Sequence, residues 1–470
     1  MKIHNVRLGF ANNSSSTHSV IFFKGKKIPQ DRILGDQGEY GWENFMLSSQ
    51  KEKARYFGTM IMTQLSESVG TYLASMLATQ IMGVEILSGN YVDHQSNMEF
   101  PAQWDGKGLN IQFLKELQSV ILRDDCLVVG SNDNSEATLE VPSGETTGIS
   151  KIPTDTRHNF VARRDPAGFW TLFNRSNGAK IRLSLTDNST PTKSAVPELV
   201  DLKITDKCPF ECNFCYMNSK PDSRHADERN LQKIVQSLAD MEVFEVAIGG
   251  GEPTISPEFS TVIEHLAHSH VIPNFTTKNF FWLESGVLGK SHLDKVGSFA
   301  ISVQSLEEMK NAYASLKKHF VNTNIVEFDV RSKASFQCIV GVMDENEFEK
   351  MLRHDMKINL TLLGYKPIGR AVPNPPHQYD WIKILKKVND EKSHFGVSID
   401  TALAKASKSQ LEAEGIPGFL YHTEEGKFSM YIDAVDMKMG PSSYCDPGQY
   451  VKLDPKADIK EQIISAFQSW

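Results

Sequence analysis

The chain repeats one pattern of apolar and polar positions from residue 200 onward. Short apolar runs alternate with longer stretches, such as residues 226–241 and 256–269, whose apolar positions recur at helical spacing. Such alternation is typical of parallel β/α proteins with buried strands. The six apolar runs are residues 200–205, 243–249, 272–277, 298–303, 335–341 and 358–363. We therefore predict an α/β fold with a partial (βα)6 TIM-type barrel, with an open doubly wound sheet as the alternative.

The pattern before residue 196 is different and predicts a separate α+β domain. Short β-like runs at residues 19–24 and 126–130 flank a helix near residues 59–83. Two further β-rich runs lie on either side of the sequence DPAG at residues 165–168, which predicts a hairpin. The polar stretch NNSSSTHS, residues 12–19, predicts a hairpin loop between two short strands. The role of this domain is open, and substrate recognition is one candidate.

A chain of 470 residues is too long for a single hydrophobic core. We predict three parts, which are an N-terminal α+β domain (residues 1–195), the β/α core (196–375) and a small C-terminal extension (376–470). Within the extension, the sequence FSMYIDAVDMKMG at residues 428–440 predicts a strand pair or a strand and a turn.

Composition and charge exclude several classes of protein. The chain is 40% hydrophobic and 23% charged, with a net charge of −8, as in soluble globular proteins and not in proteins that coat nucleic acid. The most hydrophobic window, residues 69–87, contains Thr, Ser, Gln and Glu, so it predicts a packed helix and not a membrane span. The N-terminus lacks the apolar core of a secretory signal. We expect a cytoplasmic protein without a membrane partner and without nucleic acid.

Three of the six cysteines are clustered in the sequence CPFECNFC, which begins at residue 208 and follows the first predicted strand directly. Cysteine thiolates suit zinc or an iron–sulfur cluster. A structural zinc needs four ligands, and His225 or Cys445 are candidates for the fourth, although no second C-x2-C pair exists. A [4Fe–4S] cube held by three cysteines leaves one iron open to a substrate or cofactor. The spacing alone leaves both kinds of site open.

Two motifs together resemble the radical S-adenosylmethionine (radical SAM) superfamily. CPFECNFC is similar to its motif C-x3-C-x-aromatic-C, with Phe214 as the aromatic residue, and the sequence GGEP at residues 250–253 resembles its Gly-Gly-Glu-Pro motif. The resemblance implies that a [4Fe–4S] cluster is bound by Cys208, Cys212 and Cys215. It further implies that S-adenosylmethionine chelates the open iron and is cleaved by one electron to a 5′-deoxyadenosyl radical, which abstracts a substrate hydrogen.

The same resemblance implies roles for further residues around S-adenosylmethionine. Gly250 and Gly251 would let the backbone approach the ligand, Glu252 would accept hydrogen bonds from its ammonium group, and Ser302 and Gln304 lie where members contact the ribose. The C-terminal extension resembles the SPASM or twitch segment of many members, with Cys445 in the place of a cysteine. Residues 376–470 contain no other cysteine, so we do not expect an auxiliary cluster, and Cys445 is a candidate catalytic residue.

The sequence therefore predicts a radical SAM enzyme that receives electrons from a flavodoxin or a ferredoxin. We expect a peptide or protein substrate by analogy with peptide-modifying members, with a nucleotide or another small molecule as the alternative. A non-catalytic metal-binding scaffold protein is the hypothesis from another class.

Overall fold

The computed structural model divides the chain into two compact units. The first, here the N-terminal unit, comprises Met1–His4 and Lys26–Pro191, and the second, the C-terminal unit, comprises Asn5–Gly25 and Thr192–Trp470. The predicted division into three parts stays a prediction. The residues that the structure describes are 2–7, 18–20, 39–40, 45–47, 50–92, 128–130, 160–175, 178, 180–184, 192–280, 290–322, 333–356, 358–391, 397–416 and 421–470.

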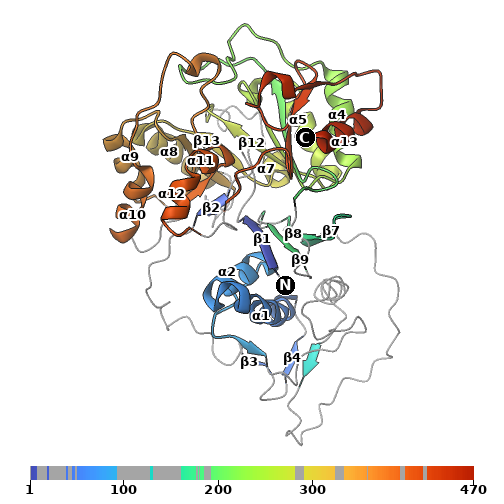
Figure 1. Ribbon diagram of the computed structural model, residues 1–470, viewed down its shortest axis with the longest axis vertical. Coiled ribbons are helices and arrows are strands. Elements are labelled where there is room, and N and C mark those ends of the chain that lie inside the picture. Colours follow the sequence, from blue (N-terminus) through green and yellow to red (C-terminus); the bar gives the residue numbers. More distant parts are fainter. Residues whose placement is uncertain are drawn as a thin grey trace, which may run out of the picture. The chain divides into compact units, whose positions relative to one another are not determined.

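One large, mainly parallel sheet forms the centre of the C-terminal unit (Figure 1). All six predicted apolar runs are strands of this sheet, within two residues of the predicted bounds. Its eleven strands, in spatial order, are β19 (Val451–Lys452), β18 (Lys438–Gly440), β17 (Ser429–Asp433), β10 (Leu199–Thr205), β11 (Glu245–Gly250), β12 (Ile272–Thr277), β13 (Phe299–Ser302), β14 (Ala334–Ile339), β15 (Asn359–Leu363), β16 (Val397–Ile399) and β2 (His18–Val20).

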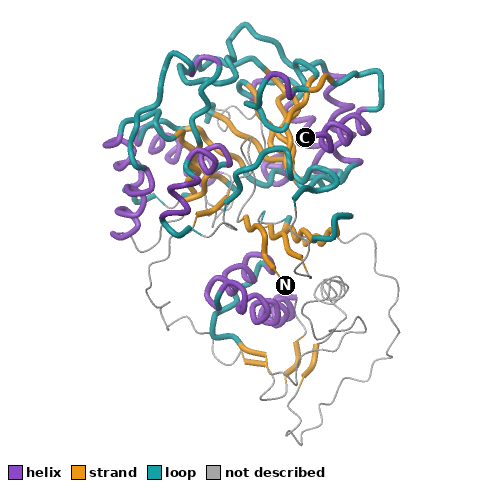
Figure 2. The backbone as a smooth tube through the Cα atoms, viewed as in Figure 1, coloured by secondary structure: helices purple, strands orange, loops and turns teal. Residues whose placement is uncertain are grey.

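The strand order decides between the two predicted architectures. Strands β10 to β16 are neighbours in sequence order and each pair is parallel. A doubly wound sheet reverses its order partway, whereas right-handed crossovers between consecutive neighbours put the helices on one face, as in a barrel. The predicted α/β fold with a partial barrel is therefore confirmed (Figure 2).

The described helices of the C-terminal unit lie mainly between successive strands and after the last of them (Figure 1). They are α4 (Glu228–Asp240), α5 (Phe259–His268), α7 (Lys290–Lys295), α8 (Leu306–Asn322), α9 (Glu345–Leu352), α10 (Trp381–Glu391), α11 (Thr401–Ala406), α12 (Lys408–Ala413) and α13 (Ile459–Ser469). Three short 3-10 helices are η3 (Pro253–Ile255), η5 (Gly369–Ala371) and η7 (Pro447–Gln449).

Helix α4 illustrates how the sequence builds this layer. Its apolar residues Leu231, Ile234, Val235 and Leu238 recur at helical spacing and are all buried against the sheet. Burial of each such side chain contributes about 1.5–3 kcal/mol. The helix begins at Asp227, whose carboxylate accepts a hydrogen bond from the backbone N–H of Asn230 at 3.0 Å and so satisfies one free donor of the first turn.

The C-terminal extension completes the barrel sheet, which the sequence pattern did not predict. Strands β17 and β18 form the expected antiparallel pair. However, β17 also pairs in parallel with β10, with Asp201 opposite Tyr431. The pattern of alternating residues identifies β17 as a strand but contains no information on this pairing, because the partner lies more than 220 residues away in the chain.

The N-terminal unit contains the predicted DPAG hairpin, formed by β7 (Phe160–Arg164) and β8 (Trp170–Asn174). In the four-stranded sheet, β7 is followed by β8, β9 (Lys180–Ser184) and β1 (Lys2–Arg7), of which residues 2–4 belong to this unit. Two small pairs join β3 (Glu39–Tyr40) to β5 (Tyr91–Val92), and β4 (Phe45–Leu47) to β6 (Val128–Gly130). The predicted single helix is instead two helices, α1 (Gln50–Val69) and α2 (Thr71–Met82).

The N-terminal residues differ from the predicted pattern in two places. The helix breaks at Gly70, whose φ of 78° lies in the left-handed region that only glycine adopts readily. The predicted hairpin around residues 12–19 is wrong, because β1 joins the sheet of β7–β9 whereas β2 pairs with β16. Residues 12–17 themselves, and Cys126, lie outside the described residues.

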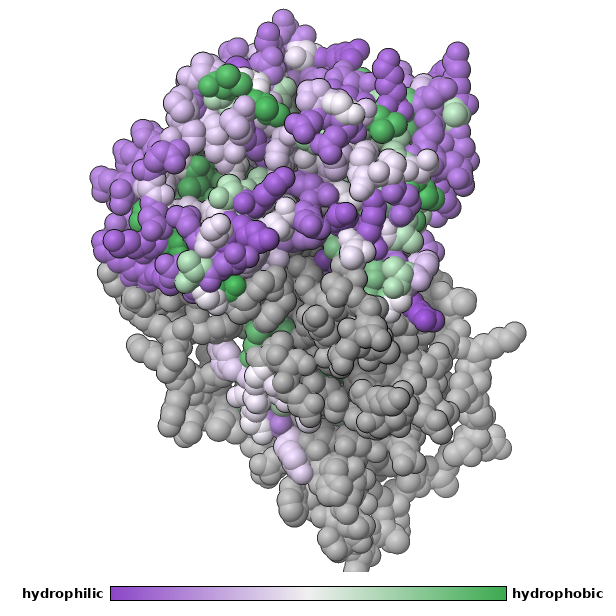
Figure 3. Space-filling model, viewed as in Figure 1, coloured by the Kyte–Doolittle hydropathy of each residue, from purple (hydrophilic) through white to green (hydrophobic). Residues whose placement is uncertain are grey.

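Two observations concern the hydrophobicity of the helices and of the surface. Among the described residues, none of the helices has the length and hydropathy required to cross a membrane. On the visible face of the described C-terminal unit, hydrophobic residues are scattered between hydrophilic ones (Figure 3).

Candidate active site

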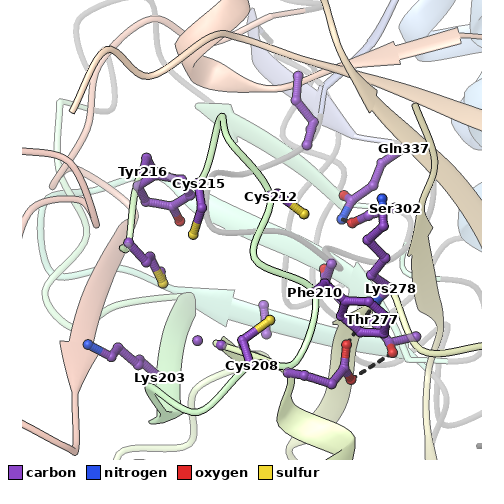
Figure 4. Close-up of a pocket in the computed structure, with 18 of the residues that line it drawn as sticks. Lys203, Cys208, Phe210, Cys212, Cys215, Tyr216, Thr277, Lys278, Ser302 and Gln337 are labelled. Carbon is purple, nitrogen blue, oxygen red and sulfur yellow. Dashed lines mark hydrogen bonds between the residues drawn. The ribbon is translucent and has the colours of Figure 1, made fainter. Parts of the chain in front are cut away.

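A pocket opens where the carboxyl ends of the barrel strands meet the loop that carries the three clustered cysteines (Figure 4). Its walls come from β10 and its following loop, from the ends of β11 to β15, and from β17. In parallel β/α proteins this end of the sheet is where ligands bind, because loops from several strands converge there. Every residue that the radical SAM resemblance assigns to the cluster or to S-adenosylmethionine lines this pocket.

The cysteine loop, residues 206–220, carries the thiols of Cys208, Cys212 and Cys215 on the pocket wall (Figure 4). The backbone N–H of Cys208 donates to the carbonyl of Lys220 at 3.0 Å, which closes the base of the loop. The backbone N–H of Cys215 donates to the carbonyl of Cys212 at 3.2 Å and forms a tight turn. All three cysteines are half-buried and none is in a disulfide.

The environment of Cys208 and Cys212 favours the protonated form of these two thiols in the absence of a metal. Burial raises the pKa of Cys208 to about 11, and the neighbouring carboxylate of Glu252 and the other two cysteines add to this effect. Burial also raises the pKa of Cys212, against which the positive charge of Lys278 acts. A metal that binds here must therefore displace protons from soft sulfur ligands.

The donor set fits a cluster better than a single ion. Among the described residues, no three His, Cys, Asp or Glu side chains lie close enough together to hold one metal ion. In a [4Fe–4S] cube each cysteine binds a different iron atom, so its ligands are spread around the cluster and do not converge on one point. Three separated thiols on one pocket wall have the chemistry and the arrangement that such a cube requires.

Arg370 holds the cysteine loop in place, a role that the sequence did not reveal. Its Nε donates to the carbonyl of Cys212 at 3.0 Å, its Nη1 to the carbonyl of Ser219 at 2.6 Å, and its backbone N–H to the carbonyl of Cys215 at 3.0 Å. The preceding Gly369, with a φ of 60°, lies so close that a Cβ would contact the carbonyl oxygen of Tyr216 at 2.5 Å. The segment after β15 thus clamps the loop.

Gly250 and Gly251 bring the end of β11 against the start of the same loop. A Cβ on Gly250 would overlap the carbonyl oxygen of Thr205, and one on Gly251 would overlap that of Lys207. In place of a side chain, the N–H of Gly251 donates to Thr205 at 2.7 Å and the N–H of Glu252 to Lys207 at 2.9 Å. The glycines therefore support the cysteine loop as well as lining the pocket.

Glu252 is only 1% exposed and lies at the junction of three pocket segments. Its Oε1 accepts hydrogen bonds from the hydroxyl groups of Thr254 at 2.6 Å and Thr277 at 2.7 Å, and its Oε2 accepts one from the backbone N–H of Lys278 at 3.0 Å. Burial raises the pKa of Glu252 although these hydrogen bonds act in the opposite direction. Oε2 has capacity for a further donor, since a carboxylate oxygen accepts two.

A group of polar side chains lies on the far side of the pocket from β10. Gln337, on β14, donates from Nε2 to the hydroxyl of Ser302 at 3.1 Å (Figure 4). The side-chain oxygens of Gln337 and Gln304 are buried and have no hydrogen-bond partner among the described residues. Buried unsatisfied acceptors are costly, so these two oxygens suit a ligand that brings hydrogen-bond donors, such as ribose hydroxyls. Gln337 was not predicted from the sequence.

The remaining candidates lie in different places. Phe214 lines the pocket beside the cysteines. Cys445 does not line it; its thiol lies next to Gly440 and Tyr450. His225 does not line it either, and its Nδ1 is 2.9 Å from the hydroxyl of Thr205. A catalytic role of Cys445 therefore has no support in this geometry, and it stays a prediction.

Comparison with known families agrees with this geometry. Residues 202–326, which include both motifs and strands β11 to β13, match the model of the radical SAM superfamily. Members of this superfamily use a [4Fe–4S] cluster and S-adenosylmethionine, the two cofactors that the motifs predict.

Individual relatives match over shorter stretches. The mycofactocin maturase MftC of Mycobacterium ulcerans is 35% identical over 82 residues, or 17% of this chain and 22% of the relative. The GTP 3′,8-cyclase of Pasteurella multocida is 32% identical over 119 residues, or 23% of this chain and 33% of the relative. The chain thus spans a third or less of the length of these relatives.

Among solved structures, Streptococcus suis SuiB bound to S-adenosylmethionine is similar, with a TM-score of 0.47 and 14% sequence identity. The match covers 65% of this chain and 86% of SuiB. Because residues 202–326 match the family model, the chain carries a domain of the radical SAM superfamily, as its cysteine and GGEP motifs predict.

Proposed function

We propose that this protein is an enzyme that cleaves S-adenosylmethionine reductively and removes a hydrogen atom from a substrate. The observation that carries the proposal is the arrangement of Cys208, Cys212 and Cys215 on one wall of a pocket within a radical SAM domain. When bound, a [4Fe–4S] cluster supplies the electron that breaks the C–S bond of S-adenosylmethionine. Reduction of the reconstituted protein in the presence of S-adenosylmethionine, with 5′-deoxyadenosine as the measured product, tests the proposal.

The protein's own residues bind and orient the ligands. Cys208, Cys212 and Cys215 would hold three irons, and Arg370 would keep their loop in a fixed shape. The free acceptor capacity of Glu252 suits the ammonium group of S-adenosylmethionine. Gln304, Ser302 and Gln337 form a second polar group, at a separate part of the pocket, that suits the ribose.

Loss of the Glu252 charge should weaken S-adenosylmethionine binding without loss of the cluster. A hydrogen bond to a charged group contributes about 1.5–3 kcal/mol, so Glu252→Gln should raise the Kd roughly ten- to hundredfold. Equilibrium dialysis of the reconstituted variant with labelled S-adenosylmethionine measures this.

Thr254→Val is the matched control, because it removes a donor from Oε1 of Glu252 and leaves the carboxylate. We expect the Kd of the control to change much less. Equal losses in the two variants would show that Glu252 acts through its internal hydrogen bonds and does not contact the ligand.

Loss of the Arg370 clamp should loosen the cysteine loop. Arg370→Gln removes the donors to the carbonyls of Cys212 and Ser219, and we expect a several-fold faster loss of iron to a chelator. Asn374→Ala is the control. Asn374 donates to the loop carbonyl of Asn213 at 3.0 Å, and this carbonyl is more exposed than those that Arg370 contacts. Identical rates for wild type and Arg370→Gln would contradict the role of the clamp.

We further propose a peptide or protein as the substrate. Two features support it, namely the large part of the chain outside the matched domain and the similarity to a maturase. The similarity to a GTP cyclase favours the alternative, a nucleotide.

Transfer of deuterium separates the two substrate classes. Extracts of the source cells, grown in deuterated medium, are divided into protein, peptide and nucleotide fractions and offered to the enzyme with unlabelled S-adenosylmethionine. Hydrogen abstraction places substrate deuterium in 5′-deoxyadenosine, which mass spectrometry detects. We expect deuterium in 5′-deoxyadenosine only with the protein or peptide fraction, and we expect protease treatment of that fraction to abolish the transfer. Transfer that survives protease treatment but is lost after nucleotides are removed would contradict a peptide substrate.

A further inference from the structure

A buried carboxyl group deep in the same pocket has a role that none of the motifs explains. Asp201 belongs to β10, lines the pocket and is only 3% exposed. Its Oδ1 has no hydrogen-bond partner among the described residues. Because a buried acceptor without a partner destabilises the folded protein, such a group is retained where a ligand supplies the missing donor.

The position of Asp201 separates it from the sites assigned to the cofactors. It lies four residues before the end of β10, a length of about 13 Å along the strand at a rise of about 3.3 Å per residue, on the side away from the cysteine loop. Gln304 and Gln337, the ribose candidates, belong to β13, its following turn and β14, with β11 and β12 between these strands and β10 in the sheet. Asp201 therefore faces the space beneath the cofactors.

The charges around Asp201 are unevenly balanced. Lys366 is the cation that acts on it, but the ammonium of Lys366 lies over the rings of Tyr216 and Tyr444, at 4.5 and 4.7 Å from their centroids. Lys366 also interacts with Glu425 and Asp400, so three acidic groups share one cation.

The other two acidic groups already have hydrogen-bond donors. Asp400 accepts from the backbone N–H groups of Gly364 and Leu403, both at 2.8 Å, and Glu425 accepts from the hydroxyl of Tyr444. Asp201 is the member of this group that faces the pocket with an unpaired oxygen. Asp201 thus offers the pocket an acceptor without a donor, beside a cation that it shares with two other acidic groups.

We propose that Asp201 binds a positively charged nitrogen of the substrate, an amine or a guanidinium. This inference rests on the proposed function, because it assumes that the substrate enters the pocket beneath the cofactors. A cationic nitrogen supplies the hydrogen-bond donor that Oδ1 lacks and stabilises the carboxylate form of Asp201 by its charge. Among peptide substrates, a lysine or arginine side chain or a free N-terminus has this chemistry.

Small cations test the inference without knowledge of the substrate. Saturation-transfer NMR measures the binding of butylammonium and butylguanidinium to the reconstituted full chain with S-adenosylmethionine present. Neutral 1-butanol is the matched probe without charge. We expect both cations to bind more tightly than 1-butanol, and Asp201→Asn to weaken the cations at least about tenfold. The control Asp222→Asn, at an exposed residue just after the cysteine loop, should bind the cations as the wild type does.

Equal cation binding by wild type and Asp201→Asn, or equal binding of 1-butanol and the cations, would overturn the inference. Formation of 5′-deoxyadenosine is measured on the same samples. If it persists while cation binding does not depend on Asp201, the inference fails and the proposed function stands. If it is absent from all samples, the proposed function fails.

Stability provides a second test that needs no ligand. Burial raises the pKa of Asp201 well above its ordinary value, an effect that Glu425 reinforces and Lys366 opposes. Asp201 therefore holds its proton more tightly in the folded state than in the unfolded state. The contribution of this protonated carboxyl group to the stability of the fold is complete below pH of about 4 and is lost as the pH rises toward the raised pKa. An asparagine at this position has no proton to lose in this range. The Tm of Asp201→Asn should therefore exceed that of the wild type by an amount that grows from pH 4 to pH 8. A Tm difference that does not grow with pH would show that Asp201 is already paired.

Discussion

Replacement of any one of Cys208, Cys212 and Cys215 by Ala is expected to abolish both cluster assembly and the cleavage of S-adenosylmethionine. Each cysteine binds a different iron in a three-cysteine site, so the removal of one leaves two irons without a protein ligand. We expect a loss of activity of at least about a thousandfold, down to the background of the assay. The effect is measured by iron content, by visible absorption in the sulfur-to-iron charge-transfer bands and by formation of 5′-deoxyadenosine.

Cys445→Ala is the matched control for these three variants. Cys445 is also a half-buried cysteine of the C-terminal unit, but it does not line the pocket. The control should retain the iron content of the wild type. An active Cys208, Cys212 or Cys215 variant would contradict the ligand set, and a loss of half the iron in Cys445→Ala would point to a second cluster.

Gly251→Ala is expected to cause the next largest loss of bound iron. The cause is a steric clash and not a change of charge. The added Cβ would overlap the carbonyl oxygen of Lys207, at the start of the cysteine loop. The clash, of the order of 1–3 kcal/mol in well-packed sites, can be relieved only by displacing residues 205–207 or the end of β11. Both displacements break the hydrogen bonds from Gly251 to Thr205 and from Glu252 to Lys207.

Iron content after anaerobic reconstitution measures this effect. We expect most of the iron to be lost from Gly251→Ala. Gly249→Ala is the control, because a Cβ on Gly249 has no neighbour within 4 Å. Full iron content in Gly251→Ala would show that the contact between β11 and the cysteine loop is not required for cluster binding.

The architecture of the barrel could be predicted from the sequence because it depends on local patterns. Apolar runs and helical spacing identify β10 to β15 and the helices α4 and α5 within a few residues. The pairing of β17 with β10 and of β2 with β16 could not be predicted, since these contacts are set by tertiary packing between distant segments. For the same reason the predicted hairpin around residues 12–19 is wrong.

In the site, too, residues in local motifs could be predicted and residues brought in by tertiary packing could not. The cysteines and Glu252 belong to short motifs with a fixed spacing, so the sequence alone predicts them. Arg370 and Gln337 lie more than 120 residues from the cysteine motif, each in a segment that an ordinary strand end also explains. Asp201 is one of three polar residues in the buried strand β10, and its unpaired oxygen, which distinguishes it, cannot be read from the sequence.

We propose that three cysteines hold a cluster which serves the cleavage of S-adenosylmethionine. The most direct test is anaerobic reconstitution, reduction and quantification of iron, 5′-deoxyadenosine and methionine in one sample. We expect about four irons per chain, and equal amounts of 5′-deoxyadenosine and methionine that appear only after reduction. A colourless protein that binds zinc through Cys208, Cys212 and Cys215 and forms no 5′-deoxyadenosine would contradict it.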